Sequence, residues 1–446
     1  MNNTAALKQS ATGIRGRIRW YVCGLLFYAT TINYVDRQVL AILKPIISHE
    51  LGWNEKQYGW IVFFFQLAYA LMLPIAGRII DKLGTRIGYA VAVLVWSCAA
   101  MSHALAHSVV QFAAARFALG IGEAANFPAA IKTTAAWFPR RERALATGIF
   151  NSGSNIGALV APLLVPFIAA HYGWRFSFLT TGVLDIIWIF IWLFTYHSPR
   201  QHPRLSAEEL ALIESDGEEA QTTLDRGADS SAAQKARTIP YRLLLTRRAA
   251  WAFVIGKLLT DPVWWFYLYW LPGFLNQKYA LDLTHLGAPL IAIYLAADVG
   301  SIGGGWLSSA LLRRGFSVGR ARKIALLTCA VLVVPVMGVM WAHGNLWLTV
   351  ILIACAASGH QGWSCNLYTL VSDVFPQAAV GSLIGLGGMA GALGGMAVAP
   401  LIGYWLDFSH QAYGPLFLLA GIMYLFTLGL IQLLVPRLER VTVGAK

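Results

Sequence analysis

Gly-Arg-Ile-Ile-Asp-Lys-Leu-Gly-Thr-Arg, residues 77–86, is a short charged segment between two long apolar stretches at 57–80 and 87–106. Each flanking stretch has the roughly 20 apolar residues that an α-helix needs to cross a bilayer. The segment itself contains Asp81 and Arg86, and unpaired charges are costly inside hydrocarbon. It therefore predicts a turn between two membrane-spanning helices.

The composition of the whole chain favours a membrane protein. The chain has 446 residues, of which 57% are hydrophobic and 12% charged, and its mean hydropathy is +0.58. A soluble protein of this size could not keep so much apolar surface away from water. Without the alternating pattern of a barrel, the apolar stretches predict helices. There are twelve: 20–43, 57–80, 87–106, 109–132, 145–169, 175–196, 249–275, 285–311, 324–342, 346–372, 381–405 and 413–435.

The distribution of positive charge predicts how these helices are oriented. The formal net charge is +13, but the cations do not form a nucleic-acid-binding pattern. Most Lys and Arg residues fall at the N-terminus, in the even-numbered loops and at the C-terminus, which the positive-inside rule places in the cytoplasm. We expect both termini in the cytoplasm, no cleavable signal peptide, and location in a bacterial inner membrane.

A polar stretch at 197–247 divides the twelve segments into two sets of six. We expect two six-helix bundles, 1–196 and 248–446, joined by a cytoplasmic linker. Within the linker, Ser206 to Glu209 predicts the start of a short helix, and 221–237 a flexible tether. A shift of 237 residues aligns Phe138-Pro139 with Phe375-Pro376 and places His360 opposite Glu123, which indicates a duplicated unit.

The 77–86 turn resembles the signature loop of the major facilitator superfamily. The resemblance implies an all-α membrane fold of two pseudo-symmetric six-helix bundles that rock about a central site. It also implies gating roles for Asp81, beside a neighbouring helix N-terminus, and for Arg86, paired with acidic groups. In the second half Ser309 occupies the acidic position, so we expect a weaker latch there.

Charged residues inside the apolar stretches are the candidates for function. Stretch 20–43 contains Tyr34, Asp36 and Arg37, and stretch 109–132 contains Arg116 and Glu123, two helical turns apart on one face. Such charges are tolerated mainly where they face partners or a water-filled cavity. An alternative interpretation is fixed ion pairs that hold the two helices together.

These residues, together with Asn126, resemble the pattern of the anion:cation symporter family. The resemblance implies that Asp36 and Glu123 are proton-coupling sites, and that Arg37 and Arg116 bind the substrate carboxylate. An arginine suits this role because it forms two parallel bonds with a carboxylate. Tyr34 and Asn126 are further candidate substrate contacts.

The second half contributes two polar runs. Stretch 249–275 contains Lys257 and Asp261, four residues apart, followed by Trp265; stretch 346–372 contains His360, Gln361, Trp363 and Asn366. The first run also fits a packed aromatic helix with one internal salt bridge. Together the runs resemble the hexuronate branch of the family, which implies sugar recognition by Lys257, Trp265 and the second run, and gating by Asp261. Tyr69 and Asn155 are weaker cavity candidates, and Asp185 and Asp298 have no assigned role.

The sequence thus predicts a proton-coupled symporter for a sugar-acid anion such as galacturonate or glucuronate. The alternative is an uncoupled or exchanging carrier for galactonate, glucarate, tartrate or an aromatic acid. A membrane enzyme using Glu123 and His360 is disfavoured, because no metal-ligand spacing, nucleophile elbow or phosphate loop is present. We expect no cofactor or metal, no nucleic-acid partner, and a monomer in the lipid bilayer.

Overall fold

The computed structural model describes residues 18–53, 55–215, 239–279, 287–342, 344–410 and 412–438, which form helices and connecting turns without a strand. The first-half helices are α1 (Ile18–Leu51), α2 (Glu55–Ser102), α3 (Val109–Glu123), α4 (Asn126–Trp137), α5 (Arg140–Tyr172) and α6 (Trp174–Thr195). The stretch 197–247 contains α7 (Ala207–Glu214) and α9 (Tyr241–Leu245). The second-half helices are α10 (Arg248–Tyr279), α11 (Gly287–Arg313), α12 (Val318–Val333), α13 (Leu346–Val374), α14 (Gln377–Phe408) and α15 (Gly414–Leu434). Both chain termini and the expected tether at 221–237 lie outside the described residues.

Within the described residues, each of the twelve apolar stretches falls in helical structure, but the helices and the stretches do not match one to one. Helix α2 contains two stretches, and Gly84 between them has a φ of +76°. A Cβ on Gly88 would lie 3.6 Å from the Cα of Ile80, so the chain folds back here as a hairpin. By length and composition, eight helices of the described chain could cross a membrane. Twelve spans therefore remains a prediction.

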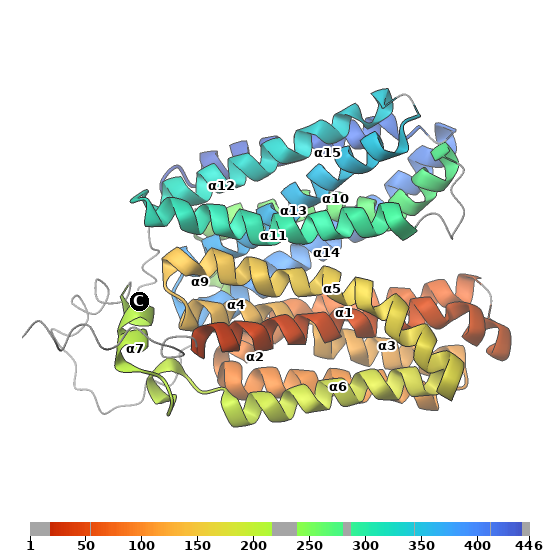
Figure 1. The fold of residues 1–446 in the computed structure, drawn as a ribbon, viewed down its shortest axis with the longest axis horizontal. Coiled ribbons are helices and arrows are strands. Elements are labelled where there is room, and N and C mark those ends of the chain that lie inside the picture. Colours follow the sequence, from red (N-terminus) through yellow and green to blue (C-terminus); the bar gives the residue numbers. More distant parts are fainter. Residues whose placement is uncertain are drawn as a thin grey trace, which may run out of the picture.

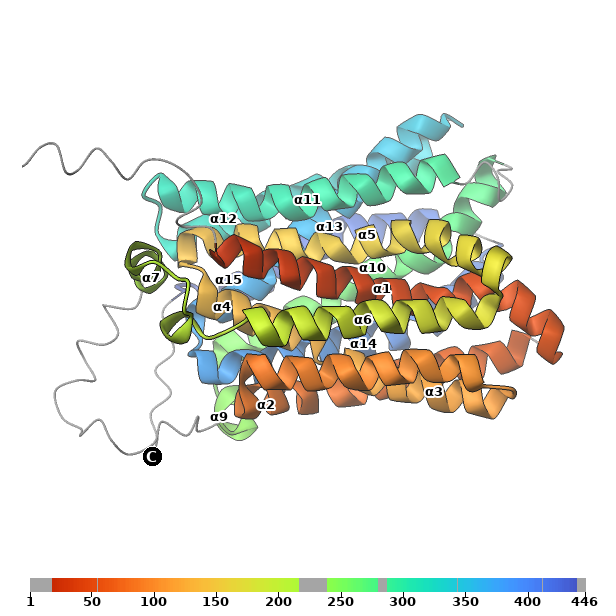
Figure 2. The same ribbon diagram turned by 60° about the horizontal axis from the view of Figure 1, so that its bottom comes forward.

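The helices gather into two groups (Figure 1). Helices α1 to α6 occupy the lower part of that view, and α10 to α13 with α15 the upper part; the view in Figure 2 shows the same long, roughly parallel helices. Large apolar side chains cover the outer faces, and Leu163 and Phe194 are each 77% exposed. Such a surface suits lipid rather than water. We call the end that carries α7 the α7 end.

Local signals in the sequence set several helix boundaries. Phe138 caps the end of α4 and α5 begins after Pro139, while Phe375 caps the end of α13 and α14 begins after Pro376. Each Pro has the extended backbone that precedes a new helix and lacks the N–H that a continuing helix would use. Helix α7 begins where expected, with the Ser206 hydroxyl accepting a hydrogen bond from the backbone N–H of Glu209 at 3.1 Å.

Glycines bring the two groups of helices into close contact. A Cβ on Gly148 of α5 would lie 2.3 Å from the carbonyl oxygen of Ser301 on α11. A Cβ on Gly77 of α2 would lie 2.1 Å from the carbonyl oxygen of Gly381 on α14. No other residue allows backbones to approach so closely without displacement. These two helix pairs form close seams between the two halves.

Candidate functional site

A cavity lies between the two halves and is lined from both. Eight of the residues expected at the site line it: Tyr34, Arg37, Tyr69, Lys257, Asp261, Trp265, His360 and Gln361. They come from α1 and α2 in the first half and from α10 and α13 in the second. The cavity therefore presents cations and aromatic rings from both bundles, which is the chemistry that a sugar-acid anion requires.

Arg37 is the cation on the first-half wall. Its guanidinium carbon lies 4.8 Å from the ring centre of Tyr34, 5.4 Å from that of Phe65 and 4.5 Å from that of Tyr69. Its Nε lies 2.5 Å from Oε2 of Glu123. Arginine is suited to such a position because its planar cation stacks on rings and still offers parallel donors. Arg37 thus links the cavity to a buried acid.

Glu123 lies behind Arg37, in the interior of the first half. Its side chain is 0% exposed, and it ends α3 just before the break between α3 and α4. Gly120 and Gly122 allow this placement. A Cβ on Gly120 would lie 2.6 Å from the carbonyl oxygen of Phe65, and a Cβ on Gly122 would lie 2.6 Å from the backbone nitrogen of Trp96. Helix α3 therefore packs closely against the parts of α2 on both sides of its bend at Gly84. Glu123 is therefore reached from the cavity through Arg37.

Asp36 and Arg116 are placed differently from the sequence expectation. Neither is among the described residues that line the cavity. Asp36 is turned towards α6, where Thr181 and Asp185 are its neighbours. Arg116 donates to the backbone carbonyl of Arg37 at 3.4 Å rather than facing the cavity. A helix presents adjacent residues about 100° apart, so Asp36 faces a different neighbour from Arg37.

Lys257 and Asp261 form the charged part of the second-half wall. Lys257 Nζ lies 2.8 Å from an Asp261 carboxylate oxygen and 3.1 Å from the Tyr368 hydroxyl. The close approach of α14 positions this pair, because a Cβ on Gly391 would lie 2.0 Å from the Asp261 carboxylate, and one on Gly395 would lie 2.4 Å from the Trp265 ring. Asp261, expected at a gate, thus lines the cavity as a partner of Lys257.

His360 and Gln361 complete the cavity wall from α13. The His360 ring stacks on Trp264 with centroids 4.9 Å apart, and its Nδ1 lies 2.5 Å from the Tyr424 hydroxyl. Gln361 Oε1 accepts a hydrogen bond of 2.8 Å from Asn151 on α5. Hydrogen-bonding groups from the two halves therefore meet directly at the cavity.

Several cavity residues were not predicted. These residues are Asn151, Ser154, Trp264, Tyr368, Leu73, Phe127, Ser364, Ile384, Gly388 and Ala392. A signal for Asn151 exists in the sequence, since it lies one helical turn before Asn155 in an otherwise apolar stretch. No comparable signal marks Trp264, because every aromatic of α10 fits a packed helix equally well.

Four expected contacts hold helices together instead of lining the cavity. Asn126 accepts a hydrogen bond from Tyr89, and Asn155 donates to Asp298 on α11 at 2.8 Å. The Trp363 indole packs edge-on against Tyr424, with centroids 5.5 Å apart. Asn366 donates to the carbonyl oxygens of Gly304 and Gly362 at 3.0 and 2.9 Å. Asn126, Asn155 and Asn366 each form at least one hydrogen bond to a buried partner, which favours their placement between helices.

Asp81 bonds across the two halves near the α7 end. Its carboxylate accepts hydrogen bonds from the backbone N–H groups of Gly381 and Ser382 at 3.1 and 2.7 Å, and from the Ser382 hydroxyl at 2.7 Å. Lys132 of α4 lies 3.0 Å away. Gly381 and Ser382 are the fifth and sixth residues of α14, so Asp81 contacts this helix in its second turn. Asp81 therefore ties α2, just before its bend at Gly84, to α14.

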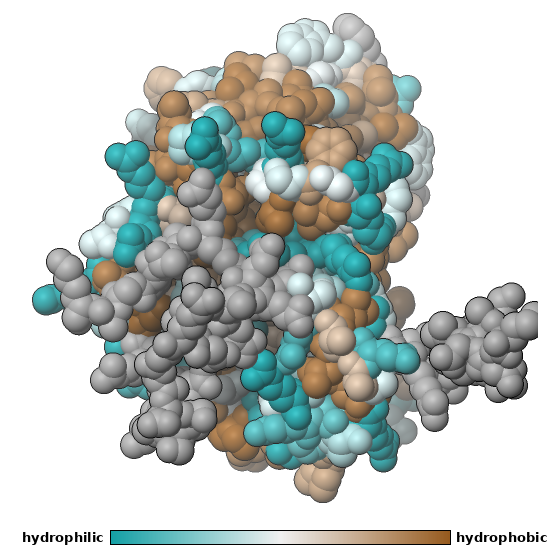
Figure 3. All heavy atoms as spheres, turned by 90° about the vertical axis from the view of Figure 1, so that its left-hand side faces the viewer, coloured by the Kyte–Doolittle hydropathy of each residue, from teal (hydrophilic) through white to brown (hydrophobic). Residues whose placement is uncertain are grey.

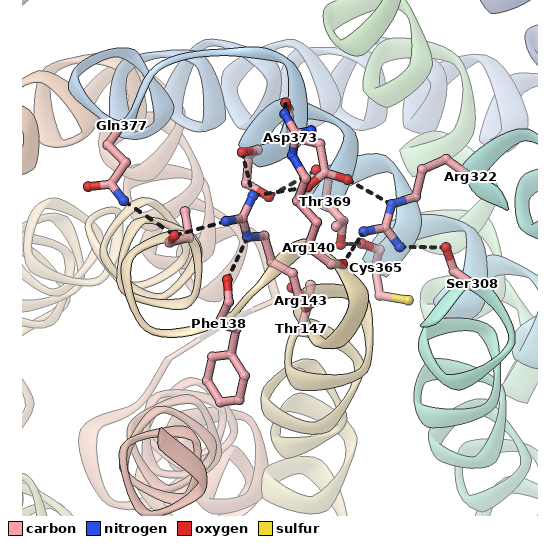
Figure 4. Close-up of polar contacts among 12 residues, drawn as sticks. Phe138, Arg140, Arg143, Thr147, Ser308, Arg322, Cys365, Thr369, Asp373 and Gln377 are labelled. Atoms are coloured by element: carbon pink, nitrogen blue, oxygen red, sulfur yellow. Dashed lines mark hydrogen bonds and ion pairs between the residues drawn. The ribbon is translucent and has the colours of Figure 1, made fainter. Parts of the chain in front are cut away.

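A second cross-half contact centres on Asp373, at the end of α13 (Figure 4). Its carboxylate bonds to Arg143 of α5 at 3.0 Å and to Arg322 of α12 at 2.9 Å. Arg322 also donates to the backbone carbonyl of Arg140, and Arg140 to that of Asp373, each at 2.9 Å. The members of this network are far apart along the chain, so no local pattern in the sequence predicts it.

The contacts at the α7 end differ in two ways from the sequence expectation. Arg86 donates to the Leu193 carbonyl of α6 at 2.8 Å, within the first half, and among the described residues it has no acidic partner. The weak second-half latch expected from Ser309 is replaced by the Asp373 network, and Ser309 itself is buried. Figure 3 shows polar side chains spread over this end between apolar flanks.

Comparison with known proteins places the chain among transporters. The model of the Major Facilitator Superfamily matches residues 26–398. A "Hexuronate transporter" of Escherichia coli (strain K12) is 34% identical over 402 residues, which cover 90% of this chain and 90% of that protein. A "Galacturonate transporter" of Dickeya chrysanthemi is 33% identical over 346 residues, 76% of this chain and 95% of that protein.

A solved structure supports the fold. The proton:xylose symporter XylE, bound to 6-bromo-6-deoxy-D-glucose, superimposes with a TM-score of 0.74 at 14% identity, and covers 96% of this chain and 98% of its own. At this identity the likeness concerns the arrangement of helices alone.

Proposed function

This chain belongs to the Major Facilitator Superfamily and is a membrane transport protein related to bacterial sugar-acid transporters, and on that premise we propose that it imports a hexuronate anion together with a proton. The observation that carries this proposal is the bond between Arg37, at the cavity surface, and Glu123, fully buried behind it. In this proposal, the Arg37 guanidinium pairs with Glu123 until a substrate carboxylate binds.

The proposed coupling is a competition for Arg37. A substrate carboxylate in the cavity takes up the donors of Arg37 that Glu123 uses when the cavity is empty. Glu123 then lies in a buried site without its cation, and a buried carboxylate without a partner takes a proton. Proton uptake and anion binding thereby become one event. When the proton leaves on the other side, Glu123 reclaims Arg37 and the substrate is released.

In the proposed cycle, the second-half wall of the cavity recognises the sugar ring. Trp264 and Trp265 offer flat apolar faces for the C–H side of a pyranose ring, and His360 and Gln361 offer groups that bond its hydroxyls. Lys257 supplies a second positive charge beside Asp261. A hexuronate combines one carboxylate with a ring of hydroxyls, which matches one arginine facing a polar, aromatic wall.

The contacts at the α7 end represent one state of an alternating-access cycle. If this end is cytoplasmic, as the positive charge of its loops predicts, Asp81 and Asp373 close the cavity to the cytoplasm. Helices α5 with α11 and α2 with α14 are the seams about which the halves rock. The glycines on those seams permit sliding without steric conflict.

The experiment is uptake by purified protein in proteoliposomes with a pH-sensitive dye outside. Addition of galacturonate should make the outer medium more alkaline as protons enter with the anion. Glu123→Gln should abolish this signal and uphill accumulation, yet retain exchange of labelled for unlabelled galacturonate. Accumulation by the Gln variant equal to that of the wild type would exclude Glu123 as the coupling site. Uptake without alkalinisation in the wild type would favour the uncoupled or exchanging carrier, to be tested with galactonate and glucarate.

A further inference from the structure

We infer that Asp185 of α6 and Asp36 of α1 form a carboxyl pair that shares one proton and relays protons to Glu123. This inference rests on the proposed function and adds to it a residue with no sequence-assigned role. Asp36 is 2% exposed and Asp185 is 0% exposed. The two carboxyl groups lie within hydrogen-bonding reach of each other.

The polar neighbours of the pair are the Thr181 hydroxyl, beside Asp36, and the Trp96 indole N–H, beside Asp185. Among the described residues, no donor is placed to form a hydrogen bond with any of the four carboxyl oxygens. The Thr181 hydroxyl beside Asp36 donates instead to the Phe178 carbonyl at 3.3 Å. The Trp96 indole N–H beside Asp185 is buried and itself lacks a partner. Two ionised carboxylates both accept hydrogen bonds and repel each other, so contact between them requires a proton on one.

The charge balance of the surrounding cluster leads to the same result. Asp36, Glu123 and Asp185 are three buried acids, and Arg37 and Arg116 are the two cations beside them. With every group ionised, the cluster has one negative charge in excess, and a single shared proton makes it neutral. The other titratable groups facing these five are Tyr28, Tyr34, Tyr58, Tyr69 and His103.

Buried polar atoms without partners connect the pair to Glu123. Both amide atoms of Asn33, one turn before Asp36, lack a partner, as do Oε1 of Glu123 and Nε of Arg116. Buried polar groups are normally satisfied by protein or by ordered water. The inference requires internal water at these atoms to carry protons from the Asp pair to Glu123. In the described residues no group of three or more acids, histidines or cysteines is arranged to hold a metal ion.

The relay explains how Glu123 exchanges its proton while Arg37 and the substrate close the cavity side. The shared proton passes through water to the Glu123 carboxylate as a proton from the external water replaces it, so the pair keeps one proton throughout. Each proton that Glu123 gains is thus balanced by one taken up from outside. Glu123 and Arg37 determine whether coupling occurs, and Asp185 determines how fast the proton reaches them.

The test is Asp185→Asn in proteoliposomes with labelled galacturonate. Proton-driven accumulation should slow by about tenfold or more, because a proton-transfer group is lost, while gradient-free exchange is retained. Glu214→Gln is the matched control, since Glu214 forms an exposed pair with Arg200 at the α7 end and should behave as the wild type. Accumulation by Asp185→Asn at the wild-type rate would overturn the inference. Absence of proton-driven accumulation in the wild type would instead overturn the proposed function.

A spectroscopic measurement keeps the inference testable if Asp185→Asn does not fold. The infrared spectrum of the wild type should contain the carbonyl band of a buried protonated carboxyl group, and Asp36→Asn should lose or shift it. A wild-type spectrum without this band at neutral pH would rule out the shared proton. Because this measurement needs no transport, its result is independent of the substrate.

Discussion

Nε of Arg37 lies 2.5 Å from Oε2 of Glu123, so a cation at the cavity surface is bonded to an acid that solvent does not reach. In the proposed cycle two processes meet at this bond: recognition of an anion from one side and protonation of an acid from the other. Side-chain exposure of 15% for Arg37 and 0% for Glu123 separates the two roles.

Replacing Arg37 by Lys should weaken substrate binding while keeping the positive charge. The ammonium cannot form two parallel bonds with a carboxylate, and the loss of one charge-assisted hydrogen bond, about 1.4 kcal/mol, corresponds to a roughly tenfold rise in KM. Initial uptake rates over a range of galacturonate concentrations measure this. Arg175→Lys, at the exposed pair with Glu50, is the control. An unchanged KM for Arg37→Lys would show that the substrate carboxylate binds elsewhere.

The effects on stability of replacing Lys257 and Asp261 should be coupled. Lys257→Gln leaves the partly buried Asp261 carboxylate, whose side chain is 17% exposed, without its cation and should destabilise the protein by about 3 kcal/mol. The double variant Lys257→Gln/Asp261→Asn has no unpaired charge, so its Tm should return towards the wild-type value while uptake stays low. Thermal unfolding in detergent and uptake in proteoliposomes separate the two effects. A double variant no more stable than the single one would show that the pair contributes little.

Loss of the Asp373 carboxylate should open the α7 end. Asp373→Asn removes a charge that bonds Arg143 and Arg322, and leaving buried cations without their partner costs about 3 kcal/mol. The population with the two halves separated at this end should increase. Spin labels at exposed Arg141 and Arg320 report that separation as a longer distance. Identical distance distributions in variant and wild type would mean that Asp373 does not hold this end closed.

Gly77→Ala should act on the same equilibrium by steric conflict. The added Cβ would lie 2.1 Å from the Gly381 carbonyl oxygen, and neither backbone can move aside easily. The variant should therefore favour the state in which α2 and α14 are apart, with slower uptake. Gly429→Ala is the matched control, since nothing lies within 4 Å of a Cβ there. Wild-type uptake rates for Gly77→Ala would contradict a close contact at this seam.

The sequence identified the chemistry of the site better than its geometry. Arg37, Lys257 and His360 stand out because charged or titratable groups are rare in apolar stretches, and all three line the cavity. Arg116 and Asn366 stand out equally, yet they bond the backbone within their own halves. Hydropathy indicates that a polar group needs a partner, but it does not indicate which partner is nearest.

By itself the sequence determined the helices, because apolar length, Phe-Pro stops and the Ser206 cap act within a few residues of one another. It also determined the superfamily, because the 77–86 turn has its charges at fixed local spacing. Only the tertiary structure decided that Asp373 joins Arg143 to Arg322, and that Asp185 faces Asp36. Those pairs bring together distant segments, and their contact depends on how each helix is rotated in its bundle. That rotation is fixed by packing between helices, such as glycines against neighbouring backbones, and no single stretch of sequence contains it.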